Sequence, residues 1–221
     1  MNPRPRATRG ISTAEVLAGT ALSLMTVGTV FTVQQAQLRS LATQATYAQS
    51  QTVTRTVIDL MSREVRMAGY NPTGLALTLT IAAGCLNIQE AVTEATATRV
   101  HIRQDLNGDG VINAAGEDVV YDLGQNQVRR QDGASAPLAL VDNVPTSGLA
   151  FKYFDSSNPP VELVPGGSPA ALSTCQRAAI AKIRVTVTAN IVDPDPRNAS
   201  RPVKSTAESE VAIRARSLLN I

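Results

Sequence analysis

Hydrophobic positions follow three different patterns along the chain. From Val16 to Leu38 no charged residue occurs, and apolar side chains occupy every face of a helical projection. Because about 20 apolar residues span the hydrocarbon core of a bilayer, this run predicts a helix surrounded by lipid or by other helices. Residues 39–70 are amphipathic, and after Pro72 short alternating runs predict β-strands.

The amphipathic stretch continues the apolar run as one helix. Apolar residues recur every three or four positions from Val53 to Ala68, which is typical of a helix with one buried face. Gly69 stands where such a helix ends, and Pro72 follows it. Since no proline lies between the basic N-terminus and Pro72, the pattern predicts a continuous helix over residues 11–68, whose second half carries a domain on its apolar stripe.

The remainder of the chain predicts a β-rich head over residues 71–221. Clusters of Gly, Pro, Asn and Asp separate the alternating runs. The expected strands lie near residues 77–81, 100–102, 118–123, 127–130, 138–141, 149–154, 183–191 and 211–215, and the Asp193–Pro202 loop joins the two longest. The fold class is therefore α+β, with a long N-terminal helix packed against an antiparallel sheet.

Composition and charge exclude several functions. Aromatic residues make up 3% of the chain and Trp is absent, which argues against a stacking platform for single-stranded nucleic acid. The formal net charge is +2, but three arginines precede Gly10, so the chain beyond it is slightly acidic and nucleic acid is not an expected partner. Several basic residues of the head are interpreted as solvated strand faces: Arg129, Arg130, Lys182, Arg184, Arg197, Arg201 and Lys204.

Glu15 at the head of the apolar run needs an explanation. An acid inside a membrane segment is costly and normally has a partner. A secretory signal peptide would have a shorter apolar region that ends in a small-residue cleavage site. A plain signal anchor would fit the basic N-terminus but would leave Glu15 unexplained.

Gly10, Ile11 and Glu15 resemble the processing site of type IV prepilins and pseudopilins. The resemblance implies that a prepilin peptidase cleaves between Gly10 and Ile11, removing a leader of residues 1–10, and that Ile11 is then N-methylated. It also implies that Glu15 pairs with the new amino terminus of a neighbouring subunit, which agrees with the mutual relief of two charges in a low dielectric. Thr13 departs from the family pattern, because the family usually has an apolar residue there.

The segment Leu60–Gly74 carries a second resemblance. Helices of PilW-like minor pilins and of J-type pseudopilins end in a similar sequence motif. The matching residues here are Arg66, Ala68, Gly69, Tyr70, Asn71 and Pro72. The resemblance implies a structural subunit without enzyme activity or small-molecule substrate. Its residues 11–38 would lie in the bacterial inner membrane or the filament core, and its head in the periplasm and then on the pilus. Its partners would be prepilin peptidase and other major and minor pilins, with a role in priming the pilus or at its tip. A minor pseudopilin of type II secretion is the alternative.

One loop suggests metal chemistry. Asp105, Asn107 and Asp109 stand at alternate positions before a glycine, as in the first half of a calcium loop. The carbonyl of Val111 and the carboxylate of Glu117 or Asp118 would complete the shell, although no helix pattern flanks the loop. The alternative is a hydrophilic hairpin, because Asn-Gly and Asp-Gly favour hairpin turns. No cofactor is required, and Ca²⁺ is the one suggested. A head for calcium-dependent adhesion or DNA capture is thus a second function class.

The remaining candidates for chemistry are few. Cys85 and Cys175 are predicted to form a disulfide in an oxidising periplasm, worth about 4 kcal/mol on the chain-entropy model. Two unrelated buried thiols are the alternative. His101 is the single histidine of the chain and lies in an alternating run between arginines. It is interpreted as a surface or edge residue rather than a catalytic base.

Overall fold

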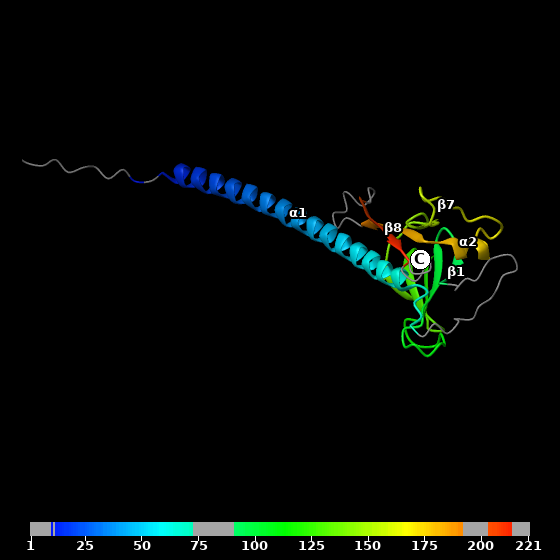
Figure 1. Ribbon diagram of the computed structural model, residues 1–221. Helices are drawn as coiled ribbons and strands as arrows, with labels where there is room; N and C mark the ends of the chain where they lie inside the picture. The colour runs from blue at the N-terminus through cyan, green and yellow to red at the C-terminus, as the bar shows by residue number, and fades with distance from the viewer. Residues whose placement is uncertain (1–9, 11, 73–90, 192–202, 214–221) are drawn as a thin grey trace, which may run out of the picture. The chain divides into compact units, whose positions relative to one another are not determined.

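By its internal contacts the chain divides into two units. Figure 1 shows the long N-terminal helix and the β-strands. The computed structural model describes residues 10, 12–72, 91–191 and 203–213. By their internal contacts these residues fall into the units Met1–Ala45 and Thr46–Ile221, and the second unit holds all the described strands.

Both units contain part of α1, a single helix over Thr13–Met67. It begins directly after Ser12, whose hydroxyl oxygen accepts a hydrogen bond from the Ala14 amide at 3.3 Å, as helix N-caps do. It ends before Gly69, which has a φ of 74°, a left-handed conformation that favours glycine. The predicted continuous helix and its glycine stop are confirmed.

The second unit contains two antiparallel sheets. The first follows chain order, with β1 (Val92–Ala95), β2 (Arg99–Arg103), β3 (Asp118–Gly124), β4 (Gln127–Asp132) and β5 (Leu138–Val141). The second has the order β7-β6-β8-β9, with β6 at Leu149–Phe154, β7 at Glu162–Leu163, β8 at Lys182–Ile191 and β9 at Val203–Ala212. A short helix, α2 (Thr174–Ala179), precedes β8.

The core of this unit lies between the second half of α1 and the inner faces of both sheets. Val57, Met61 and Val65 of α1 belong to one buried cluster with residues of the strands. Along β8 every second residue is buried, from Ile183 to Ile191, as a half-buried strand requires. The α+β arrangement of a long helix and an antiparallel β head is therefore confirmed.

The strand pairing differs from the expected single sheet. β6 pairs with β8 and β7 rather than with β5. Alternation identifies the buried face of a strand but not the strand beside it, so the division into two sheets could not be predicted. β9 begins at Val203 rather than near residue 211, because its polar residues pair with β8 along the whole strand. The strand expected near residues 77–81 lies outside the described residues.

Gly148 offers a test of the packing between β6 and β8. A Cβ atom there would lie 2.5 Å from the Thr188 carbonyl oxygen. Gly148 cannot easily move away, because its N–H donates to the Pro145 carbonyl at 2.7 Å and its own carbonyl accepts from the Thr188 amide at 2.6 Å. We expect Gly148→Ala to lower the free energy of unfolding by about 3 kcal/mol, measured by chemical unfolding of the full chain in detergent. The matched control is Gly166→Ala, where a Cβ meets nothing within 4 Å and stability should hold.

Candidate functional site

The predicted processing site lies at the start of the described chain. Gly10 is exposed, and Ile11 lies outside the described residues. A Cβ atom on Gly10 would meet nothing within 4 Å, and its φ does not lie in the left-handed region. Among the described residues, therefore, neither packing nor backbone conformation requires a glycine at this position.

Glu15 lies in the first turn of α1. Its backbone N–H donates to the Ser12 carbonyl at 3.0 Å, so the carboxylate stands at the positive end of the helix dipole. A carboxylate in such a position gains about 0.3–1 kcal/mol. That gain is small beside the cost of about 2.5–3.5 kcal/mol for an acid within a membrane-spanning helix. The chain itself thus gives only a weak reason for an acid here.

The apolar run of the first unit presents its large side chains to the outside. Their exposure ranges from 54% at Val16 to 73% at Leu24. In the described part of the chain, α1 is the helix long and apolar enough to cross a membrane, with a mean hydropathy of 1.8 over an 18-residue window. The run therefore has the length and composition of a membrane span.

Hydroxyl side chains within this run bond to the helix itself. Each donates to a backbone carbonyl three or four residues earlier, at 2.8–3.0 Å; the donors are Thr20, Ser23, Thr26, Thr29 and Thr32. An unpaired hydroxyl would be costly in hydrocarbon. The polar residues that dilute the hydrophobicity of the run are consequently compatible with a lipid environment.

The loop between β2 and β3 is organised around the buried carboxylate of Glu117. This side chain is 0% exposed. Each of its oxygens accepts two backbone N–H bonds, at 2.8–3.2 Å, from Leu106, Asn107, Asn113 and Ala114. Asp105, also buried, accepts two more from Gly108 and Gly110 at 2.7 and 2.9 Å. Backbone amides of the loop thus surround both carboxylates.

The charge of Glu117 makes the head sensitive to acid. Burial alone would raise the pKa of Glu117, but the four amide donors outweigh it and lower the pKa below 4.5. A lowered pKa stabilises the fold fully above pH 4.5, and the contribution is lost as the pH falls through the lower value. We expect Glu117→Gln to cost about 2 kcal/mol at neutral pH, because its amide group cannot accept from two of the donors. In unfolding curves the difference from the wild type should shrink below pH 4.5. The control, Asp109→Asn in the exposed part of the loop, should not show this pH dependence.

The predicted calcium ligands all lie in this loop. The described residues include no group of three or more His, Cys, Asp or Glu side chains placed to hold a metal ion. Asn107 donates its side-chain amide to Asp109 at 2.9 Å, and Val111 is 52% exposed. The loop connects two strands that pair antiparallel, so it is a long hairpin connection. Binding of Ca²⁺ by Asp105, Asn107, Asp109, Val111 and Glu117 stays a prediction.

Calorimetry tests the calcium prediction directly. If the loop binds Ca²⁺, millimolar calcium should give a saturable heat with the wild-type chain and none with Asp109→Asn, which loses a charged oxygen ligand. Asp142→Asn, an exposed acid outside the loop, should behave as the wild type does. Absence of heat with the wild type would contradict calcium binding.

A charged cluster that the sequence analysis did not detect joins α1 to the first sheet. Arg130 of β4 donates to Glu64 of α1 through Nε at 3.1 Å and Nη2 at 2.9 Å. The Tyr121 hydroxyl of β3 donates to the same carboxylate. Burial, reinforced by Glu64, raises the pKa of Tyr121, so the phenol stays neutral. One feature of the sequence could have indicated this cluster. Glu64 directly precedes the buried Val65, so its carboxylate lies at the edge of the apolar stripe.

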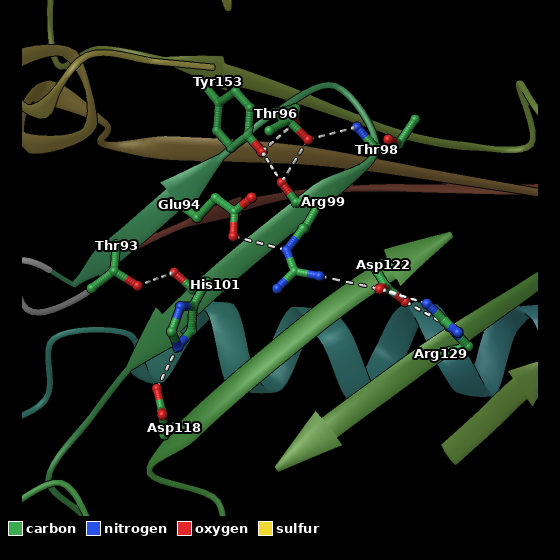
Figure 2. A network of polar contacts seen from close by, with 10 residues as sticks. All are labelled: Thr93, Glu94, Thr96, Thr98, Arg99, His101, Asp118, Asp122, Arg129 and Tyr153. Atoms are coloured by element: carbon green, nitrogen blue, oxygen red, sulfur yellow. Dashed lines mark hydrogen bonds and ion pairs between the residues drawn. The ribbon is translucent and has the colours of Figure 1, made fainter. Parts of the chain in front are cut away.

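The other face of the first sheet carries a ladder of ion pairs, which Figure 2 shows with α1 passing behind the strands. Arg99 donates to Glu94 at 2.8 Å and to Asp122 at 3.2 Å, and Asp122 also accepts from Arg129 at 2.8 Å. The face is therefore balanced in charge. This agrees with the interpretation of Arg129 as part of a polar strand face.

His101 belongs to a second group on the same face. β2 lies between β1 and β3, so His101 is not at an edge of the sheet, and its side chain is 18% exposed. It bonds to Asp118, which also accepts from Arg103 at 3.2 Å. Burial alone would raise the pKa of Asp118, but these two partners lower it.

The remaining predicted residues are placed as follows. Lys182 and Arg184 of β8 pair with Glu210 of β9 at 3.3 and 2.8 Å. These two basic residues therefore lie on a strand face where carboxylates balance their charge. Arg197 and Arg201 lie outside the described residues. Cys175 lies in α2 and carries no free thiol, while Cys85 lies outside the described residues, so their pairing stays a prediction.

Comparison with known proteins gives little further information. No protein-family model matches the sequence, and no curated protein matches it. Among solved structures the chain is similar to the type IV-like pilin TTHA1219 from Thermus thermophilus, with 14% identity and a TM-score of 0.44. The match covers 76% of this chain and 97% of that chain. Similarity at this level does not carry the role of that protein over to this one.

Proposed function

We propose that this chain is a type IV prepilin that is cleaved between Gly10 and Ile11. The observation that carries the proposal is the exposed Gly10, which nothing among the described residues requires. A glycine without a role in its own chain is explained if a peptidase must approach the backbone there, because glycine alone presents no side chain to an enzyme. An uncharged run and Glu15 then follow at the positions that the prepilin pattern needs.

The mature chain would act as a structural subunit. Its helix inserts in the inner membrane and then packs with other helices, while Glu15 pairs with the amino group of Ile11 in a neighbouring subunit. Gly19 and Gly28 support packing against other helices, because an added Cβ would meet nothing within 4 Å in this chain. Glycine inside a helix costs about 0.5–1 kcal/mol relative to alanine, so close approach by a second helix gives these positions a purpose.

The finer assignment is a PilW-like minor pilin. Two features support this assignment. The helix lacks a proline along its whole length, and the motif from Arg66 to Pro72 begins in its last turn and continues beyond it. Its partners are prepilin peptidase and other major and minor pilins. The chain lies first in the inner membrane and later on the pilus surface. Its role is to prime the pilus or to be incorporated at its tip. A J-type minor pseudopilin of type II secretion shares these features and is the alternative.

A head that binds calcium for adhesion, or that captures DNA, is a weaker candidate. The observation in its favour is the Asp105–Asp118 loop, whose outer residues are exposed. Among the described residues, Arg99, Arg129 and Arg184 are each paired with carboxylates, which weakens these three side chains as contacts for a polyanion. Calcium calorimetry decides the first part of this alternative.

The mature N-terminus tests the proposal. Mass spectrometry of the chain purified from membranes should find N-methylated Ile11 as the first residue, with the leader and its arginines removed. An intact N-terminus, or cleavage after the apolar run as in a secretory signal peptide, would contradict the proposal.

A further inference from the structure

We propose that the β2–β3 loop and the C-terminal turns of α1 form one coupled unit, joined through Asp132, Arg130 and Glu64. A change in the loop would then alter how firmly the first sheet holds the helix. The coupling is a property of the second unit of the chain. It depends neither on calcium nor on the proposed role as a pilin.

The first connection is a series of polar contacts. The Gly116 amide at the end of the loop donates to both carboxylate oxygens of Asp132, each at 2.9 Å. Asp132 also accepts from Arg130 at 3.3 Å, and Arg130 holds Glu64 of α1 at 2.9 Å. The side chains of Arg130 and Glu64 are 19% and 14% exposed. Charges in such a site are screened less than at the surface. Loss of one ion pair therefore weakens the neighbouring ion pair.

The second connection is made by the backbone at the other end of the loop. The Gly69 amide, just after α1, donates to the Arg103 carbonyl at 2.7 Å. The Asp105 amide donates to the Tyr70 carbonyl at 2.8 Å. One end of the loop is therefore tied to α1 through side chains, and the other end is tied by main-chain hydrogen bonds to the residues that directly follow α1.

A displacement of the outer side of the loop is transmitted to the contacts on its inner side. Its outer side chains Leu106 and Val111 are 42% and 52% exposed. Its inner side is held by Glu117, whose carboxylate binds amides from both arms of the loop. A displacement of Leu106 thus acts on Glu117, and through the neighbouring Gly116 on Asp132.

Hydrogen exchange of the full chain in detergent tests the coupling. Asp132→Asn removes the charge that links Gly116 to Arg130 while keeping the size of the side chain. We expect amides of residues 104–117 and of the last turns of α1, residues 61–69, to exchange at least about fivefold faster, the lower end of typical coupling. Amides of β8 should keep their rates and so report that global stability is preserved.

Asp122→Asn is the matched control. Asp122 also bridges two arginines, but on the face of the sheet turned away from α1 (Figure 2), so its replacement should leave exchange in α1 unchanged. Because coupling is reciprocal, Glu64→Gln should in turn speed exchange in the loop. The proposal is overturned if Asp132→Asn loosens the loop alone, if it speeds α1 and β8 equally, or if Glu64→Gln leaves the loop unchanged.

Discussion

Glu15→Ala is expected to leave leader removal intact and to abolish filament assembly. If Glu15 pairs with a neighbour's amino terminus in a low dielectric, its removal leaves a buried ammonium group without a partner. Breaking such a pair costs about 3–5 kcal/mol. Because about 1.4 kcal/mol corresponds to a factor of ten at equilibrium, assembled subunits should fall by a hundredfold or more. Mass spectrometry of the N-terminus and the amount of this chain recovered in sheared filaments measure the two effects.

Two further variants separate pairing from a local effect on the helix. Glu15→Gln keeps the shape of the side chain but not its charge, so it should fail in assembly as Glu15→Ala does. Asp59→Ala removes an exposed acid from the second half of α1 and should assemble normally. A role limited to the first turn of the helix is worth about 0.3–1 kcal/mol and would reduce assembly only severalfold. Filaments in normal amounts from Glu15→Ala would rule out the pairing mechanism.

The helix could be predicted from the sequence because its signals are local. Apolar spacing identified the buried face from Val57 to Ala68, although Val53 is exposed and Thr54 is buried in its place. Gly69 identified the end of the helix, and its positive φ agrees with that role. The partition of strands into two sheets depends on contacts between segments far apart in the chain. Alternation in β6 is the same whether its neighbour is β5 or β8, so no sequence pattern distinguished the two. Two strands escaped prediction for different reasons. β7 has two residues, too few for alternation to show, and in β1 an irregularity between Val92 and Glu94 breaks the alternation of buried positions.

In the candidate site, too, local features could be predicted and contacts between distant segments could not. Gly10 and Glu15 were predicted because their spacing along the chain is itself the motif, and the described structure adds that Gly10 has no packing role. The part played by Glu117 could not be predicted, since its four amide donors are backbone groups placed by the fold. The same holds for Glu64, whose partners Arg130 and Tyr121 come from strands far along the chain.

Gly10→Phe should block leader removal completely while leaving the fold unchanged. A Cβ atom at position 10 would meet no atom of the described chain within 4 Å, and Gly10 precedes α1, so we expect the fold to tolerate the change. A peptidase that fits the glycine backbone closely would be obstructed by the ring, because glycine alone presents no side chain. The purified variant should keep residues 1–10 by mass, and its unfolding curve should match that of the wild type.

Blocked cleavage should then prevent assembly for a separate reason, because the amino group that Glu15 needs is not released. Gly19→Ala is the control: it changes a glycine that also has free space around it, and its leader should be removed normally. Gly10→Phe and Glu15→Ala would thus give the same loss of filaments with opposite N-termini, one uncleaved and one cleaved. Cleavage of Gly10→Phe at the wild-type rate would mean that the peptidase does not read this glycine. The exposed Gly10 would then need another explanation.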